Sequence, residues 1–183
     1  RDFALRGLAL SHAGISDDLL KQKFERLDRV SAEDIHFLYW AAAGWEGAIN
    51  FARTNQQLAA DLPMAVALMR RVIALDPAYG DGAAQEFFIA YEAGRAGADR
   101  QAARSYFEAA LSYSEREKAS TYLTWAESVA QPDQDLAEFQ RMLAASLAID
   151  IDDFPEHRLI NTLAHRRARW LQQRIPELFF DAD

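Results

Sequence analysis

Three helix-like stretches of this chain repeat at a spacing of 37 residues, and this spacing is the strongest constraint on the fold. The repeat is visible in three sets of equivalent positions: Met69, Tyr106 and Leu143; Val72, Ala109 and Ser146; Leu75, Ser112 and Ile149. A fixed period in this range is typical of stacked helical hairpins, none of which can bury its apolar face alone. Such arrays present a surface or a channel to another molecule, so the repeat favours binding over catalysis.

Composition agrees with a helical array and narrows the possible functions. The chain has 183 residues, 50% of them hydrophobic, with only 8 Gly and 5 Pro, which favours helices over a sheet sandwich. Its net charge of −8 disfavours general attraction to nucleic acid or anionic lipid. The absence of Cys excludes thiol catalysis and thiolate metal sites. No stretch is apolar enough to predict a transmembrane segment.

The apolar periodicity and the turn signals predict one all-α domain over residues 1–183. We expect N-terminal helices in 1–30, three helical hairpins in 32–150 and a capping helix in 155–183. The expected helices are 2–14, 16–30, 32–55, 62–75, 83–94, 99–113, 115–130, 133–148 and 156–174. Asp and Ser at helix starts and Pro or Gly in the turns set these limits.

The hairpins resemble degenerate tetratricopeptide repeats. The first-helix pattern of an aromatic residue followed by small residues is met by Trp40, Ala43, Gly44 and Gly47. The second-helix pattern is met loosely by Ala65, Met69, Val72 and Pro77. We therefore predict an all-α fold of stacked helical hairpins, a degenerate tetratricopeptide-like repeat array.

Several longer motifs, in order along the chain, point to a particular family. They are Tyr39-Trp40-Ala41-Ala42-Ala43-Gly44-Trp45, Asp61-Leu62-Pro63, Leu68-Met69-Arg70-Arg71-Val72, Leu75-Asp76-Pro77-Ala78-Tyr79-Gly80-Asp81-Gly82-Ala83, Glu86-Phe87, Phe154-Pro155-Glu156-His157-Arg158-Leu159-Ile160-Asn161 and Ala164-His165-Arg166-Arg167-Ala168-Arg169-Trp170-Leu171. Over nearly its whole length the chain resembles the T-component proteins of tripartite ATP-independent periplasmic (TRAP) transporters.

The resemblance implies a periplasmic accessory protein that associates with the substrate-binding component of the transporter. Members of this family can form trimers and are typically lipid-anchored, here through an N-terminal segment absent from this chain. Each subunit is expected to hold a pore or cleft that hands a small organic acid or apolar ligand to the partner. Two departures stand out: the anchoring Cys is absent, and Gln85 stands where the family pattern has His.

The alternative function is a helical-repeat scaffold that binds proteins or peptides and takes no small ligand. A pore lined by apolar side chains with a few polar anchors would favour the transport role. A solid interior with an open polar groove would favour the scaffold.

The aromatic helix expected at 32–55 contains two candidate ligand-binding or pore residues, Trp45 and Asn50. A polar group on so apolar a helix needs a partner, and that partner is either a ligand or a neighbouring helix. For Trp40 and the glycines of the same helix we favour a packing role, in which another backbone comes close.

The last helix contains two further candidates, Arg158 and Asn161. Arg158, Asn161 and His165 follow the spacing i, i+3, i+7, which predicts a common face. A guanidinium and an amide together suit a carboxylate ligand. For Arg166–Arg169 the simpler interpretation is pairing with acidic neighbours and with the negative end of the helix.

No cofactor, metal site or enzymatic activity is predicted. His157 and His165 are eight residues apart, with Glu156 beside the first, whereas two ligands on one helix are expected at i, i+4. The common hydrolase, phosphate-binding and metalloprotease motifs are absent.

Overall fold

Helices alone build the described parts of the chain, which fall into two compact units. The structure is a computed structural model that describes residues 1–51 and 60–180, and of residues 46–51 the backbone only. One unit spans Arg1–Tyr79 and the other Gly80–Asp183. No strand occurs within the described ranges, so the all-α class is confirmed. A single domain over 1–183 stays a prediction.

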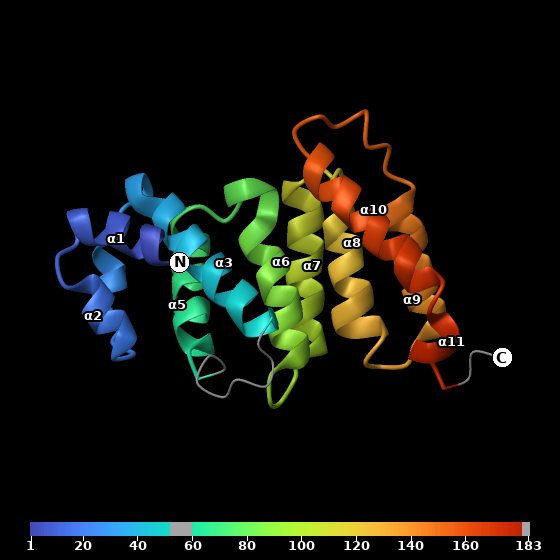
Figure 1. Ribbon diagram of the computed structural model, residues 1–183, viewed down its shortest axis with the longest axis horizontal. Helices are drawn as coiled ribbons and strands as arrows, with labels where there is room; N and C mark the ends of the chain where they lie inside the picture. Colours follow the sequence, from blue (N-terminus) through green and yellow to red (C-terminus); the bar gives the residue numbers. More distant parts are fainter. Residues whose placement is uncertain (52–59, 181–183) are drawn as a thin grey trace. The chain divides into compact units, whose positions relative to one another are not determined.

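The first unit is built around helix α3. Its elements are α1 (Asp2–Ser11), α2 (Ile15–Leu20), the 3-10 turns η1 (Glu25–Arg29) and η2 (Ala32–Asp34), α3 (Ile35–Phe51) and α5 (Leu62–Leu75). Helix α3 packs against α1 and α5 (Figure 1). The buried core is Leu8, Ile15, Leu19, Leu38, Trp45, Met64, Leu68, Met69 and Val72. These side chains follow helical spacing on each element, so one stripe of each helix is buried.

The helix predicted at 16–30 is shorter than the pattern indicated. Helix α2 ends at Leu20, and Gln22 has a left-handed φ of 55°. The N–H of Lys23 then donates to the carbonyl of Asp18 at 2.8 Å, a Schellman-type closure in which a non-glycine residue takes the left-handed position. Within the rest of the predicted span, only Glu25–Arg29 is helical, as the 3-10 turn η1.

Helix α3 tests the packing roles predicted for its aromatic and glycine residues. A Cβ on Gly44 would lie 2.7 Å from the backbone nitrogen of Arg1, so the predicted close approach of another backbone is confirmed at this glycine. Trp40, in contrast, is 62% exposed, so its predicted packing role is wrong.

The second unit is a layered set of helices that ends with α10. Its elements are α6 (Tyr79–Gly94), α7 (Arg100–Tyr113), α8 (Ala119–Trp125), the π-helical segment η3 (Ala126–Ala130), α9 (Leu136–Leu147), α10 (Arg158–Gln172) and α11 (Ile175–Leu178). Helix α10 packs on both α8 and α9, and α8 packs on α9 (Figure 1).

One continuous core runs through this unit. Phe88 of α6 stacks on Tyr106 of α7 with ring centroids 4.9 Å apart. The rings of Phe139 in α9 and Phe179 lie with their centroids 4.9 Å apart. Of the two phenylalanines that follow Pro176, Phe179 therefore folds back onto the helices. Phe180 is 93% exposed.

Left-handed turns set the start of several helices in this unit. Gly80, Asp81 and Gly82 all have positive φ, so the regular turns of α6 begin after Gly82. A Cβ on Gly82 would lie 3.0 Å from the Cα of Ala110, so a side chain there would press on the backbone of α7. Glu115 and Arg116 also have positive φ, and for this reason α8 begins at Ala119 and not at 115 as predicted.

None of the described helices is both long and apolar enough to cross a bilayer.

Candidate functional site

The N-terminal end of α10 is tied to the segment before α8 by a buried amide. The Asn161 side chain is fully buried. Its Oδ1 accepts a hydrogen bond from the backbone N–H of Ala119 at 2.8 Å, and its Nδ2 donates to the carbonyl of Glu117 at 2.9 Å. The side chain thus fixes the path of residues 117–119 and satisfies two backbone groups that would otherwise be unpaired.

A second pair of polar groups supports the same segment from α9. The Ser146 hydroxyl donates to the carbonyl of Ala119 at 3.0 Å, and His165 Nε2 donates to the carbonyl of Ser146 at 2.9 Å. Both side chains are buried. Asn161 and His165 therefore use the buried face of α10 for backbone contacts, which hold the turn that presents Glu117.

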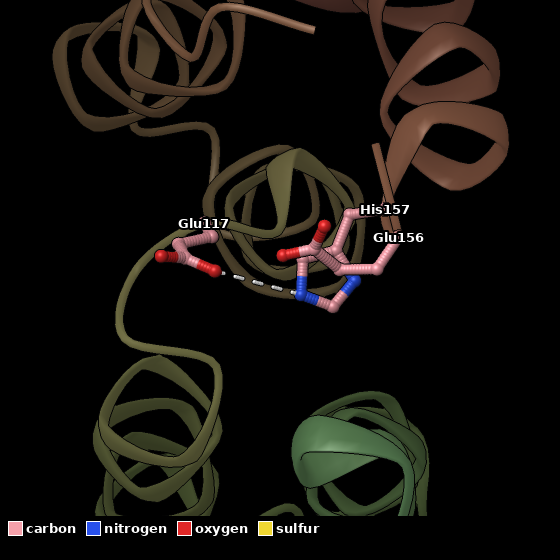
Figure 2. Close-up of side chains that lie close together, drawn as sticks. All are labelled: Glu117, Glu156 and His157. Carbon is pink, nitrogen blue, oxygen red and sulfur yellow. Dashed lines mark ion pairs between the residues drawn. The ribbon is translucent and has the colours of Figure 1, made fainter. Parts of the chain in front are cut away.

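Glu117 and the two residues before α10 form a cluster of charged and ionisable side chains (Figure 2). His157 Nε2 lies 3.8 Å from Glu117 Oε2 and 4.0 Å from Asp81 Oδ2. One ligand atom each from Glu117, Glu156 and His157 lies within 4.8 Å of the other two. The imidazole is only 10% exposed, whereas Glu156 is exposed. This group, here called the His157 cluster, is the described arrangement best suited to hold a metal ion.

The nearest lysine is already paired and does not neutralise the His157 cluster. Lys118 Nζ lies 2.8 Å from Glu86 Oε1, and the Thr121 hydroxyl donates to the same oxygen at 2.8 Å. Lys118 also donates to the carbonyls of Gly80 and Asp81, at 3.4 and 3.3 Å. This buried pair holds the left-handed turn that carries the Asp81 carboxylate.

A separate pocket of about 500 Å³ opens between α7, α8, η3 and α9. Its lining includes three arginines and three acids: Arg100, Arg104, Arg141, Asp133, Asp135 and Glu138. The Arg104 guanidinium lies 4.2 Å over the Trp125 ring, and Trp125 Nε1 donates to Glu138 at 3.0 Å.

The arginines of this pocket are engaged by the acids around them. Arg100 Nε donates to Asp133 at 2.8 Å, and this hydrogen bond raises the pKa of Arg100, although desolvation opposes it. Arg141 pairs with Glu138. A carboxylate ligand would therefore have to compete with resident carboxylates for these guanidinium groups.

The structure places the four predicted ligand-binding residues in different surroundings. Trp45 is fully buried, and its Nε1 donates to Asp61 at 3.2 Å. The Asn50 side chain lies outside the described residues. Arg158 is exposed and pairs with Asp152 at 2.8 Å, whereas Asn161 is buried against backbone groups. Arg158 and Asn161 thus do not meet on one surface.

Sequence reasoning missed the contribution of Glu117 and Asp81. Glu156 and His157 were noted in the sequence, but the search for a metal site considered only the spacing of ligands along one helix. Glu117 lies in the turn before α8, Asp81 lies in the turn at the start of α6, and Glu156 and His157 precede α10. The packing of α10 on α8 brings these separate segments together.

The chain is similar to one family of known proteins and to one curated relative. The model of the family described as TRAP transporter T-component matches residues 1–179. An uncharacterized protein of Treponema pallidum (strain Nichols) is 26% identical over 186 residues, an alignment that covers 98% of this chain and 58% of the relative. The chain therefore spans somewhat more than half the length of that relative.

Proposed function

The chain belongs to the TRAP transporter T-component family, and on this premise we propose that it acts in the periplasm by binding the substrate-binding component of its transporter. The observation that supports this role is the family match over residues 1–179. A T-component is an accessory part of an uptake system, so we expect it to bind a partner protein and to transfer a ligand, not to catalyse a reaction. We propose no enzymatic activity for it.

The ligand that we propose is a small organic acid with an apolar part, passed to the substrate-binding component through a cleft or pore. Among the predicted ligand contacts, Trp45, Asn50, Arg158 and Asn161, the exposed guanidinium of Arg158 is the one best placed for a carboxylate. Asn161 would act by holding the Glu117 turn, because both ends of its amide are already bonded.

The tetratricopeptide-like architecture belongs to the same proposal. The equivalent positions Met69, Tyr106 and Leu143 fall on α5, α7 and α9, and Met69 and Leu143 are buried. This placement supports a repeat whose second helices share a core position. A homotrimer and a lipid anchor in a preceding segment complete the family-based proposal.

The second candidate function is a scaffold that binds proteins or peptides without a small ligand. The pocket between α7 and α9 favours it, because three arginines and Trp125 line it, and Arg and Trp are enriched in protein–protein contacts. Under this alternative the arginines would exchange their resident acids for acidic side chains of a partner.

The proposal is tested by titrating the immobilised chain with the substrate-binding component of the same transporter. Saturable binding supports the T-component role, and a dependence on the ligand state of the partner supports transfer. Binding to unrelated acidic peptides with equal strength, and no preference for that component, would favour the scaffold. The variant Arg104→Ala separates the two, since it should weaken binding through the α7–α9 pocket and leave a site at Arg158 unchanged.

A further inference from the structure

We propose that Glu117, Glu156 and His157 form a binding site for a divalent transition-metal ion, with Zn²⁺ as the best-matched ion. The three side chains come from the turn after α7 and from the two residues before α10, and they face a common point (Figure 2). This inference does not depend on the proposed transport role.

The donor set matches the chemistry of such an ion. An imidazole nitrogen selects Zn²⁺ and its neighbours over Mg²⁺ and Ca²⁺, while carboxylates supply charge. Two ligand atoms bound to one ion at about 2.1 Å can lie at most about 4.2 Å apart. The ligand atoms of the cluster already lie within 4.8 Å of one another, so a small rotation of the exposed Glu156 side chain would close the site.

The surroundings of His157 also favour a ligand at its imidazole ring. Its side chain is nine-tenths buried, and such groups are normally hydrogen-bonded. Among the described residues its ring nitrogens make no hydrogen bond, and the nearest carboxylate oxygens lie 3.8 and 4.0 Å from Nε2. These separations are too long for hydrogen bonds but leave room for an ion between nitrogen and oxygen.

The charges around the imidazole also favour a cation. Asp81, Glu117 and Glu156 contribute three carboxylates, and the charge of Lys118 is taken up by Glu86. Arg158, next in sequence, pairs with Asp152. A bound ion would offset the repulsion between these carboxylates, and Asp81 or water would fill the coordination positions left open.

The ion would clamp two segments that side-chain hydrogen bonds already bring together. Glu117 lies beyond the left-handed residues Glu115 and Arg116, and His157 immediately precedes α10. Binding at both would lock the start of α10 to the turn between α7 and α8. The metal would therefore raise the stability of the second unit, since it binds the folded arrangement and not the unfolded chain.

The test is calorimetric titration of the whole, chelator-treated protein with Zn²⁺ at neutral pH in the presence of excess Mg²⁺. We expect one equivalent of Zn²⁺ to bind. Glu156→Gln, Glu117→Gln and His157→Gln should each weaken binding by at least about tenfold. The matched controls Glu115→Gln and His36→Gln, both at exposed positions, should leave the affinity unchanged.

Titration with Co²⁺ adds a spectroscopic readout. A visible absorption band that disappears in His157→Gln would assign a ring nitrogen to the ion. Because Glu156 is exposed, Glu156→Gln decides the outcome even if His157→Gln perturbs folding. No stoichiometric binding, or Zn²⁺ affinity unaltered in Glu156→Gln and Glu117→Gln, would overturn the proposal.

Discussion

Asn161 and Glu117 are joined by a hydrogen bond from the side-chain amide of one to the backbone carbonyl of the other, at 2.9 Å across 44 positions of sequence. The contact links the first turn of α10 to the turn before α8. It explains why a polar residue occupies the buried face of α10, and it fixes the backbone from which the Glu117 carboxylate projects toward His157.

Replacing Asn161 by Ala should lower the free energy of unfolding by about 2–4 kcal/mol. The change leaves the buried Ala119 N–H and the partly buried Glu117 carbonyl without their partner, and an unsatisfied buried group costs about 1–3 kcal/mol. Denaturant unfolding of the variant measures the loss. Arg158→Ala on the same helix is the control and should cost less than about 1 kcal/mol, because its ion pair is exposed. Equal losses in the two variants would contradict this account.

Lys118→Ala should destabilise the protein by about 3 kcal/mol, because it leaves Glu86 without its cation and loosens the turn at Gly80 and Asp81. The comparison variant is Arg167→Ala. The ion pair of Arg167 with Glu127 is more exposed, so its loss should lower the free energy of unfolding by less than about 1 kcal/mol. Thermal and denaturant unfolding of both variants supply the measurement. A Lys118 variant as stable as the Arg167 variant would show that the buried pair adds nothing.

Trp45→Phe should cost about 1 kcal/mol, since it keeps a buried aromatic ring but removes the hydrogen bond from Nε1 to Asp61. Trp40→Phe is the matched control on the same helix and should have almost no effect, because that ring is exposed. If Trp45 contacts a ligand, its replacement should also change the affinity for that ligand. A structural role alone would change stability only.

The stability of the protein should fall more steeply above pH 10 than that of its Tyr79→Phe variant. Burial, and then the neighbouring Asp76 carboxylate, raise the pKa of Tyr79 above its ordinary value of 10.0. The folded state therefore keeps the phenol proton longer than the unfolded chain does, so stability is lost as pH rises through this interval. Unfolding free energies of both proteins from pH 8 to 11 measure the difference. Parallel curves would be evidence against the raised pKa.

Arg158→Ala should weaken the binding of a small carboxylate ligand without unfolding the protein. The guanidinium is exposed and pairs with the Asp152 carboxylate, which a ligand can replace. Ligand titration of the variant tests this, with Arg166→Ala as the control. An unchanged affinity would remove Arg158 from the ligand site.

Local sequence signals predicted the helices whose ends are marked by side chains of known preference. Helix α5 runs from Leu62 to Leu75, as predicted, because Pro63 suits the first turn and Asp76-Pro77 ends it. Asp99 caps α7 through its side chain.

Helix ends formed by non-glycine residues in the left-handed region could not be predicted. Gln22, Glu115 and Arg116 carry no turn signal in the sequence, yet their positive φ ends α2 and delays α8. The energy that holds them in this conformation comes from packing and backbone hydrogen bonds elsewhere in the unit.

The candidate site was predictable only in part, for the same reason. Asn161 was predicted, with Arg158, to bind a carboxylate ligand, whereas its amide contacts backbone groups 42 and 44 positions away in the sequence. The approach of Glu117 and Asp81 to His157 depends on how α10 packs, which no spacing within one helix encodes.

The central claim, that this chain is the T-component of a TRAP system, is tested most directly by native mass spectrometry with the substrate-binding component of that system. We expect a discrete complex of defined stoichiometry that contains both proteins, with a trimeric core if the family assembly applies. A chain that stays free of this partner at micromolar concentrations would contradict the proposed partnership and favour the scaffold function.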